Sequence, residues 1–384
     1  MKHKIFKTFV PMLFPLLLVG CGNNQPEPEP EQPKNELTIT CTKGPMTLNL
    51  IAHARAKTGK VIDYNINLRH SKDKINWENQ TFQIQTSEEI NKIIWSIELK
   101  KGESVYLAGN NPDGFSFINE ETGAVTLSFS DTTLNSSANE NDVEFKVSGS
   151  PLSLINATDF DIIELPPSSI ATFQSLFLNS SVVDASELIL SSQTLTTLCY
   201  ANMFFECEKL INAPELPATT LTIGCYDGMF DNCTNLVNAP ILPATTLAIG
   251  CYERMFDNCG SLTNAPTLPA TTLAAGCYNH MFYRCTNLVN APILPATTFN
   301  KQCEGCYSGM FEDCGKLANV EVSFGEGNNW PKIDSVGDFT YDWLVSAGWS
   351  VENPIFKWKG SSENLALERS GSTVPTNWKI EHID

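Results

Sequence analysis

The 26-residue stretch "CYDGMFDNCTNLVNAPILPATTLAIG", residues 225–250, is followed directly by "CYERMFDNCGSLTNAPTLPATTLAAG", residues 251–276. The second copy keeps Cys, Met, Phe, Asn and Pro in place but replaces "DG" with "ER". A fixed period of this length is typical of a solenoid, in which each unit buries its apolar face only by stacking on its neighbours. The residues that are kept therefore predict a stacking core, and the residues that change predict its surface.

The period extends over at least five units. The first cysteine of each unit recurs every 26 residues, at Cys199, Cys225, Cys251 and Cys277. The next unit arrives three residues late, because an insertion lies near "CEGC", residues 303–306. Before the array, "FQSLFLNSSVVDASELIL", residues 173–190, keeps the Phe-x-x-Leu-Phe skeleton without the cysteines. It predicts a degenerate capping unit.

A single unit predicts a short helix followed by an extended segment. Apolar side chains recur at three- and four-residue spacing in its first half, at Tyr226, Met229, Phe230, Cys233 and Leu236. This spacing places them on one face of a helical turn or two. Pro240 and Pro243 then exclude helix and favour an extended chain. We therefore expect a short strand in each unit, stacked about 4.8 Å from its neighbour.

Residues 36–156 have the pattern of a different fold. They contain short, often alternating runs rich in β-branched and aromatic residues, such as "MTLNLIAHA", "VIDYNINLR" and "AVTLSFS", separated by turn signals such as "KKGE" and "NNPDG". This spacing predicts an antiparallel β-sandwich. The segment "HSKDKINWENQ", residues 70–80, is interpreted as a hairpin connection, with a binding loop as the alternative.

The first twenty residues have the features of an export signal. Three lysines precede the apolar run "FVPMLFPLLLV", which is too short to span a bilayer. The tetrapeptide "LVGC" resembles a bacterial lipobox, and the resemblance implies that Cys21 is acylated as the first residue of the mature protein. An ordinary signal peptide with a chance cysteine is the alternative. Residues 21–35, rich in Pro and Glu, predict an extended tether.

Composition and charge restrict the partners. The 384 residues are 42% hydrophobic and 18% charged, which is typical of an ordered chain. Without the leader, 22 basic residues face 43 acidic ones, and this balance opposes binding to nucleic acid or to an anionic membrane surface. We therefore expect membrane attachment through the N-terminal lipid alone. The predicted location is the outer membrane, with exposure at the cell surface.

The repeat pattern "CYxxMFxxCTNLxxAPxLPATTL" resembles the BspA-like leucine-rich repeat of bacterial surface proteins, in a variant that opens each unit with Cys-Tyr. The resemblance is strong over residues 199–320 and weaker on either side. It implies a leucine-rich-repeat solenoid with a role in surface adhesion or recognition. The last unit departs from the pattern, because "ANVEVSF", residues 318–324, replaces "NAPxLP". This segment predicts a plain β-strand at the start of a C-terminal cap.

Thirteen cysteines in an exported chain raise the question of disulfides. Most recur at fixed places in an apolar pattern, where a small buried thiol packs well, so two ladders of free thiols are predicted. Bridges between adjacent units stay open as the alternative. Cys303 and Cys306 form a C-x-x-C pair, which can be a redox or metal half-site. Since no second pair and no nearby histidine accompanies it, an insertion in the coil is the preferred explanation.

Motifs for catalysis are absent from the sequence. It contains no G-x-S-x-G, no H-E-x-x-H and no Walker loop, and its histidines are scattered. We therefore predict no catalytic residues, no metal site and no cofactor. A glycosidase that works through two carboxylates stays open, because acid pairs are expected by chance in so acidic a chain.

The residues that change between units are the candidates for function. They lie between Tyr and Met and between Phe and Cys, where helical geometry places them outward. Residue types that are enriched in interfaces gather there on two neighbouring units. The candidate partner contacts are Glu253, Arg254, His280, Tyr283 and Arg284. Drift on a tolerant surface is the alternative. The repeated asparagines are interpreted as a structural ladder.

The sequence as a whole predicts a mainly β chain with short helices. The predicted parts are a lipoprotein signal peptide (1–20), a tether (21–35), a β-sandwich (36–156), a degenerate capping repeat (157–198), a leucine-rich-repeat solenoid (199–324) and a C-terminal cap (325–384). The predicted function is non-catalytic recognition of an extracellular protein or glycan through the repeat surface. The alternatives are a secreted hydrolytic or glycan-processing component and a purely structural envelope protein.

Overall fold

The computed structural model describes residues 36–119, 121–131, 143–156, 165–166, 169–190, 195–324, 339–359 and 374–383. The predicted leader, the lipidation residue Cys21 and the tether lie outside these ranges. The described chain is mainly β, as predicted, and its helical elements are two 3₁₀ helices, η1 (Pro151–Leu154) and η2 (Lys301–Cys303). Within these ranges no helix has the length and apolar content needed to cross a membrane.

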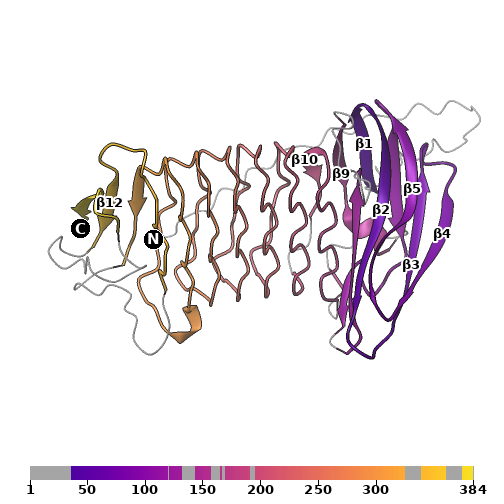
Figure 1. Cartoon of the computed structure of the whole chain (residues 1–384), viewed down its shortest axis with the longest axis horizontal. Helices are drawn as coiled ribbons and strands as arrows, with labels where there is room; N and C mark the ends of the chain where they lie inside the picture. Colours follow the sequence, from indigo (N-terminus) through magenta and orange to yellow (C-terminus); the bar gives the residue numbers. More distant parts are fainter. Residues whose placement is uncertain are drawn as a thin grey trace, which may run out of the picture. The chain divides into compact units, whose positions relative to one another are not determined.

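Two sheets form the N-terminal part of the described chain (Figure 1). The first has the strand order β10 (Val182–Leu188), β9 (Glu144–Gly149), β1 (Leu37–Lys43), β6 (Ser104–Gly109), β3 (Ile62–Ser71) and β4 (Glu78–Thr86). The second has the order β5 (Glu89–Lys100), β2 (Pro45–Ala56), β8 (Gly123–Ser130) and β7 (Phe117–Asn119). Neighbouring strands pair antiparallel, apart from β10, which lies parallel to β9. We call these ten strands the two-sheet region.

The two sheets share one apolar core. Side chains along β1 alternate between buried and half-buried, as expected for a strand with one face on a core. Rings meet from sheet to sheet: Tyr64 on β3 lies 4.2 Å from Phe117 on β7, and His70 on β3 lies 5.1 Å from Trp95 on β5. Residues 70–80 include the connection of the β3–β4 hairpin, as expected. The strand β4 is not predicted by the sequence pattern.

From residue 195 onward the chain forms successive coils that stack in register (Figure 1). The N–H of Tyr226 donates to the carbonyl of Cys251 on the next coil at 3.1 Å, and the N–H of Phe230 donates to that of Met255 at 3.0 Å. The same bonds recur from coil to coil, including across the insertion. Isolated parallel bridges also join Asn212, Asn238, Asn264, Asn290 and Asn319 in sequence.

The first half of each described repeat is a run of tight turns rather than the predicted helix. Every fourth residue there has a positive φ, as at Gly224 (57°), Gly228 (58°) and Asn232 (60°). A residue in the left-handed region interrupts an α-helix, and Gly and Asn adopt that region at low cost. Apolar spacing of three and four residues fits a repeating four-residue turn as well as a helix. The helix prediction is therefore wrong for these segments.

Two ladders of stacked rings fill the inside of the coils. Centroids of neighbouring rings lie 5.9–6.0 Å apart in the first ladder, which consists of Phe173, Tyr200, Tyr226, Tyr252, Tyr278 and Tyr307. They lie 5.4–5.7 Å apart in the second, which consists of Phe177, Phe204, Phe230, Phe256, Phe282 and Phe311. Offset-stacked rings attract one another at this separation. Each coil is therefore stabilised mainly by its two neighbours.

The stack of coils begins on the two-sheet region. A coil without cysteines supplies Phe173 and Phe177, the first rings of the two ladders. Its own carbonyls accept hydrogen bonds from the second sheet, where the N–H of Phe129 on β8 donates to Leu176 at 2.7 Å. The sheet thus supplies donors that a preceding coil would otherwise provide.

The stack ends in a segment that lacks the repeat pattern. The N–H of Tyr307 in the last repeat donates to the carbonyl of Phe339 at 2.8 Å, so residues 339–350 form one more coil. Three short parallel strands lie beside it: β11 (Asn319–Glu321), β12 (Ile355–Trp358) and β13 (Lys379–His382). The strand β11 confirms the one predicted within "ANVEVSF".

Candidate functional site

The predicted partner contacts lie on the turn segments of two adjacent coils. Glu253 and Arg254 belong to one coil, and His280, Tyr283 and Arg284 belong to the next. Both arginines are exposed, and the other three residues are half-buried. We call this surface, made by the residues between Tyr and Met and between Phe and Cys of each repeat, the variable face.

Contacts within the variable face engage several of these side chains. The Nε of Arg284 lies 3.7 Å from the Oδ2 of Asp313, and its guanidinium lies 4.6 Å from the centre of the Tyr283 ring. His280 meets the same ring edge-on at 5.4 Å and forms a hydrogen bond with Asn279 through Nδ1. Exposed ion pairs of this kind contribute about 0–1 kcal/mol. The interface-type residues are thus in contact with one another, and a partner for them remains a prediction.

Carboxyl groups surround Arg254 on the same face. Burial raises the pKa of Asp231 to about 7, with a further rise from the charge of Asp257, whereas Arg254 lowers it. Burial also raises the pKa values of Asp227 and Asp257 to about 6. No three His, Cys, Asp or Glu side chains of the described chain are arranged to hold a metal ion. These three aspartates therefore give the variable face a charge that depends on pH near neutrality.

The described cysteines are buried, with free thiols. In the second of the two cysteine positions, each thiol donates to a phenylalanine carbonyl of the preceding coil at 2.9–3.2 Å. These residues are Cys207, Cys233, Cys259, Cys285 and Cys314. Burial raises the pKa of each, so they are poor nucleophiles at neutral pH. The two predicted ladders of buried thiols are present in this arrangement.

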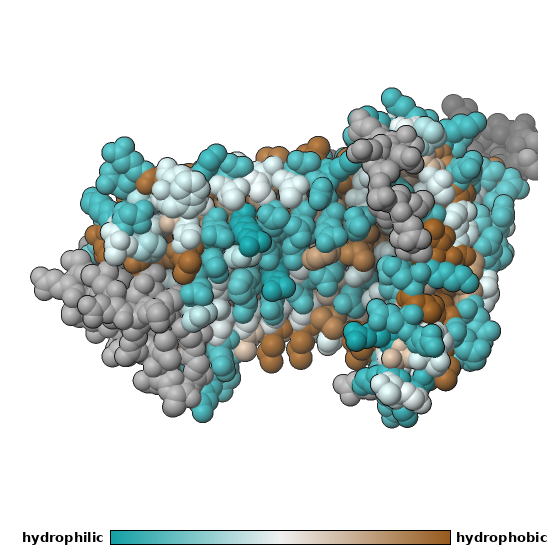
Figure 2. Space-filling model, viewed as in Figure 1, coloured by the Kyte–Doolittle hydropathy of each residue, from teal (hydrophilic) through white to brown (hydrophobic). Residues whose placement is uncertain are grey.

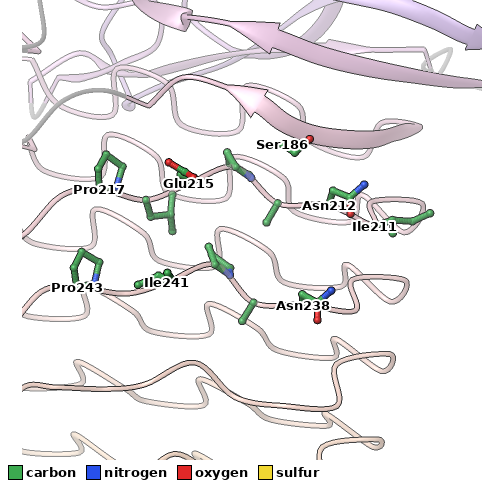
Figure 3. Close-up of a pocket in the computed structure, with 13 residues that line it drawn as sticks. Ser186, Ile211, Asn212, Glu215, Pro217, Asn238, Ile241 and Pro243 are labelled. Carbon is green, nitrogen blue, oxygen red and sulfur yellow. The ribbon is translucent and has the colours of Figure 1, made fainter.

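An open groove of about 460 Å³ lies across the extended segments of two neighbouring coils (Figure 3). Pro214 and Pro217 line it from one coil, and Pro240 and Pro243 line it from the next. Ile241 lies between the second pair and is 81% exposed, so it packs against little of its own chain. We call this surface the Pro–Ile groove.

Few polar groups border the Pro–Ile groove. Figure 3 shows Asn212 and Asn238 on successive coils toward one end, and Glu215 near Pro217 toward the other. Glu215 is exposed. An apolar surface with one carboxylate matches an apolar side chain next to a basic group. It matches a sugar less well, because each hydroxyl buried without a partner costs free energy.

Other large apolar side chains are exposed on the repeats. They are between 39% and 57% exposed and comprise Ile211, Ile223, Val237, Ile249, Val289 and Ile293. Figure 2 shows one face of the repeats to be mostly hydrophilic, with hydrophobic side chains in a row along one edge.

Sequence reasoning missed the Pro–Ile groove because it searched for variation only in the turn half of each unit. The signal is the x of "APxLP", which is Glu215, Ile241, Thr267 and Ile293 in successive units.

Comparison with known families agrees with the geometry of the coils. Residues 197–328 match the family model for the BspA type leucine-rich repeat region, in 6 copies. This part of the chain is thus similar to BspA-type leucine-rich repeats. No curated protein and no solved structure matches it. The BspA-type repeats include the coil with the insertion and the strand β11, whereas the ten strands of the two-sheet region lie outside the match.

Proposed function

We propose that this protein is a non-catalytic recognition lipoprotein, held on the outer membrane by a lipid at Cys21 with its repeats outside the cell. In this proposal the two sheets are a β-sandwich, and the repeats are a capped leucine-rich-repeat solenoid. The family supports a surface adhesion or protein-binding role in general terms. The two-sheet region serves as the base from which the repeats extend.

The Pro–Ile groove is the observation that carries the proposal. Its apolar lining is exposed on two adjacent coils, and Ile241 is free to pack against a partner. We propose that the partner is a protein segment with an apolar side chain for the groove and a neighbouring Lys or Arg for Glu215. The net charge of −18 favours association with a basic segment, since opposite charges accelerate encounter.

The variable face is proposed as a second contact. Arg284 is paired with Asp313 and lies over Tyr283, so a partner must replace contacts that already exist. Arg254 is exposed and lies among carboxyl groups that it stabilises in their charged form. Replacing existing contacts yields little net free energy, so this face contributes less affinity than the groove.

The test uses cells that carry the full chain, assayed for adhesion to arrays of extracellular proteins and of glycans. Ile241→Asp places a charge in the groove and is expected to lower adhesion to a protein target about tenfold or more. Thr267→Asp is the matched control, because Thr267 is exposed at the same position of the next repeat. Reversing Arg254 and Arg284 together is expected to have a smaller effect.

Three results contradict the proposal in different ways. Adhesion to glycans alone, unchanged by Ile241→Asp, assigns the binding to another surface and another ligand class. Absence of adhesion, together with protection of the repeats from protease on intact cells and cleavage after lysis, favours a structural envelope role. Turnover of a glycan that is lost when one carboxylate is changed to its amide favours a hydrolase.

A further inference from the structure

The insertion in the fifth repeat places one cysteine outside the two cysteine ladders. Cys306 occupies the ladder position, because the N–H of Tyr278 donates to its carbonyl at 3.1 Å, as that of Tyr252 does to Cys277. Cys303 lies three residues earlier, at the end of η2. Figure 1 draws η2 as a short orange helix where the other repeats have plain turns. Cys303 is therefore an additional thiol next to a ladder thiol.

Hydrogen bonds hold the Cys303 sulfur in place. Its Sγ accepts from the N–H of Asn300 at 3.1 Å and donates to the Asn300 carbonyl at 3.0 Å. The N–H of Cys306 donates to the carbonyl of Cys303 at 3.1 Å, so a turn closed by a backbone hydrogen bond brings the two cysteines of the C-x-x-C pair together. A thiolate at Cys303 would accept hydrogen bonds from both the Asn300 N–H and the Cys306 S–H.

The pair differs chemically from the ladder thiols. The hydrogen bond from Cys306 lowers the pKa of Cys303 to about 7, although burial opposes this. Burial raises the pKa of Cys306, and its hydrogen bond to Cys303 raises it further. Burial raises the pKa values of Cys225 and Cys277 to about 12. A thiol with a pKa near ambient pH is the most effective attacking group in disulfide exchange.

We propose that Cys303 and Cys306 form a thiol–disulfide exchange site, at which a low-molecular-weight disulfide oxidises the pair to an intramolecular bridge. The Cys303 thiolate attacks one sulfur of the disulfide, forms a mixed disulfide and releases one small thiolate. That thiolate removes the proton of Cys306, whose sulfur then attacks the Sγ of Cys303 and releases the second small thiolate. The second thiolate takes up the proton that Cys303 lost on ionising. Two protein thiols and one disulfide thus give one protein disulfide and two small thiols.

The position of Cys303 and Cys306 in the stack determines how a bridge between them affects local opening of this coil. Cys303 is 2% exposed, but Gln302 and Glu304 beside it are exposed, so opening of this short turn brings the thiol to solvent. The carbonyl of Cys306 accepts a hydrogen bond from the N–H of Tyr278 on the preceding coil. A bridge therefore ties the inserted turn to the stack of coils. Oxidation is expected to slow local opening of this coil, and reduction is expected to restore it.

The experiment treats the folded, full-length protein at pH 7 with oxidised glutathione. The sample is then acid-quenched, unfolded, alkylated and mapped by peptide mass. We expect one peptide with Cys303 and Cys306 unalkylated and two hydrogens lighter, and ladder cysteines that are fully alkylated. Cys306→Ser is expected to stop at a glutathione adduct on Cys303. Cys251→Ser, at the ladder position that corresponds to Cys306, is the matched control and is expected to leave bridge formation unchanged.

The rate of reaction supplies an independent measurement. Cys303→Ser is expected to lower the rate of reaction of the folded protein with an aromatic disulfide about tenfold or more at pH 7. The rate in the unaltered protein is expected to rise with a midpoint near pH 7, the pKa of Cys303. Ladder cysteines that react as fast as Cys303 in the folded state would overturn the proposal. A first bridge between adjacent coils, such as Cys277 to Cys303, would overturn it as well.

Discussion

The two-sheet region and the BspA-type repeats differ in how far apart along the chain their partners lie. In the first sheet β1 pairs with β6 and β9, so Thr38 lies opposite both Tyr106 and Ser148. In the repeats, backbone hydrogen bonds join Tyr226 to Cys251, one coil later. The sheets must therefore form or fail as a unit, whereas coils that contact only their neighbours can open locally.

The largest expected effect comes from removing a stacked ring. Phe256 is fully buried between Phe230 and Phe282, with centroids at 5.7 and 5.6 Å, so Phe256→Ala is expected to cost about 3–5 kcal/mol. Hydrogen exchange followed by mass spectrometry should show lost protection in the coils around residue 256 and unchanged protection in β2. Phe129→Ala, at an equally buried ring on β8, is the counterpart and should lower protection across both sheets. Equal loss in β2 for both variants would contradict the comparison.

An intermediate effect on stability is expected when an asparagine is replaced by alanine, and its size should differ between the two regions. Asn111 is buried, donates to the carbonyls of Asn67 and Leu154 at 2.9 and 2.7 Å, and accepts from the N–H of Asn67. Asn111→Ala leaves these groups unpaired and is expected to cost about 1–3 kcal/mol in urea unfolding. Asn264→Ala is the control, because Asn264 is exposed and its side chain donates to Thr263. A larger cost for Asn264→Ala than for Asn111→Ala would reverse the ranking.

The difference in sequence separation between the partners in the repeats and in the sheets also explains which features the sequence could predict. The repeat "CYxxMFxxC" is a local pattern written several times, so the period and the stacking residues follow from it. The strand β11 was predicted where "ANVEVSF" departs from this pattern. The helix prediction failed because three- and four-residue spacing does not distinguish a helix from four-residue turns. Gly224 and Gly250, at corresponding positions of successive units, are the signal for the left-handed positions. The pairing of β1 with β9 joins residues more than a hundred positions apart and has no comparable local signal.

Site prediction was limited in the same way. The sequence placed Arg254 and Arg284 on the surface correctly, but it could not reveal that Arg284 pairs with Asp313 of the next coil. The C-x-x-C pair was recognised, yet its hydrogen bonds with Asn300 depend on the 3₁₀ turn that the insertion forms. Contacts between coils arise only after stacking, so a residue of the next coil determines the surroundings of Arg284, whereas those of Cys303 depend on how the inserted turn folds.

The smallest expected effect concerns pH and the carboxyl groups around Arg254. An unfolded Asp has a pKa near 3.9, whereas burial raises that of Asp231 in the folded protein to about 7. Between these values the folded state binds more protons at Asp231 than the unfolded state, so the contribution of Asp231 to stability rises as the pH falls from 7.5 toward 4. Asp257 shifts in the same direction, to about 6. In the two-sheet region burial lowers the pKa values of His53 and His70, and this acts in the opposite direction.

Asp231→Asn tests the pH prediction directly. At pH 7.5 it removes a buried charge and is expected to raise stability by about 1 kcal/mol, measured by thermal unfolding. At pH 5 the folded carboxyl group is already protonated and only the unfolded one is ionised, so the gain should be smaller than at pH 7.5 and should vanish below about pH 4. Glu215→Gln is the control for the loss of one negative charge, since Glu215 is exposed. A gain for Asp231→Asn that is equal at both pH values would show that burial of the charge is not its cause, because only the ionised form is destabilised by desolvation.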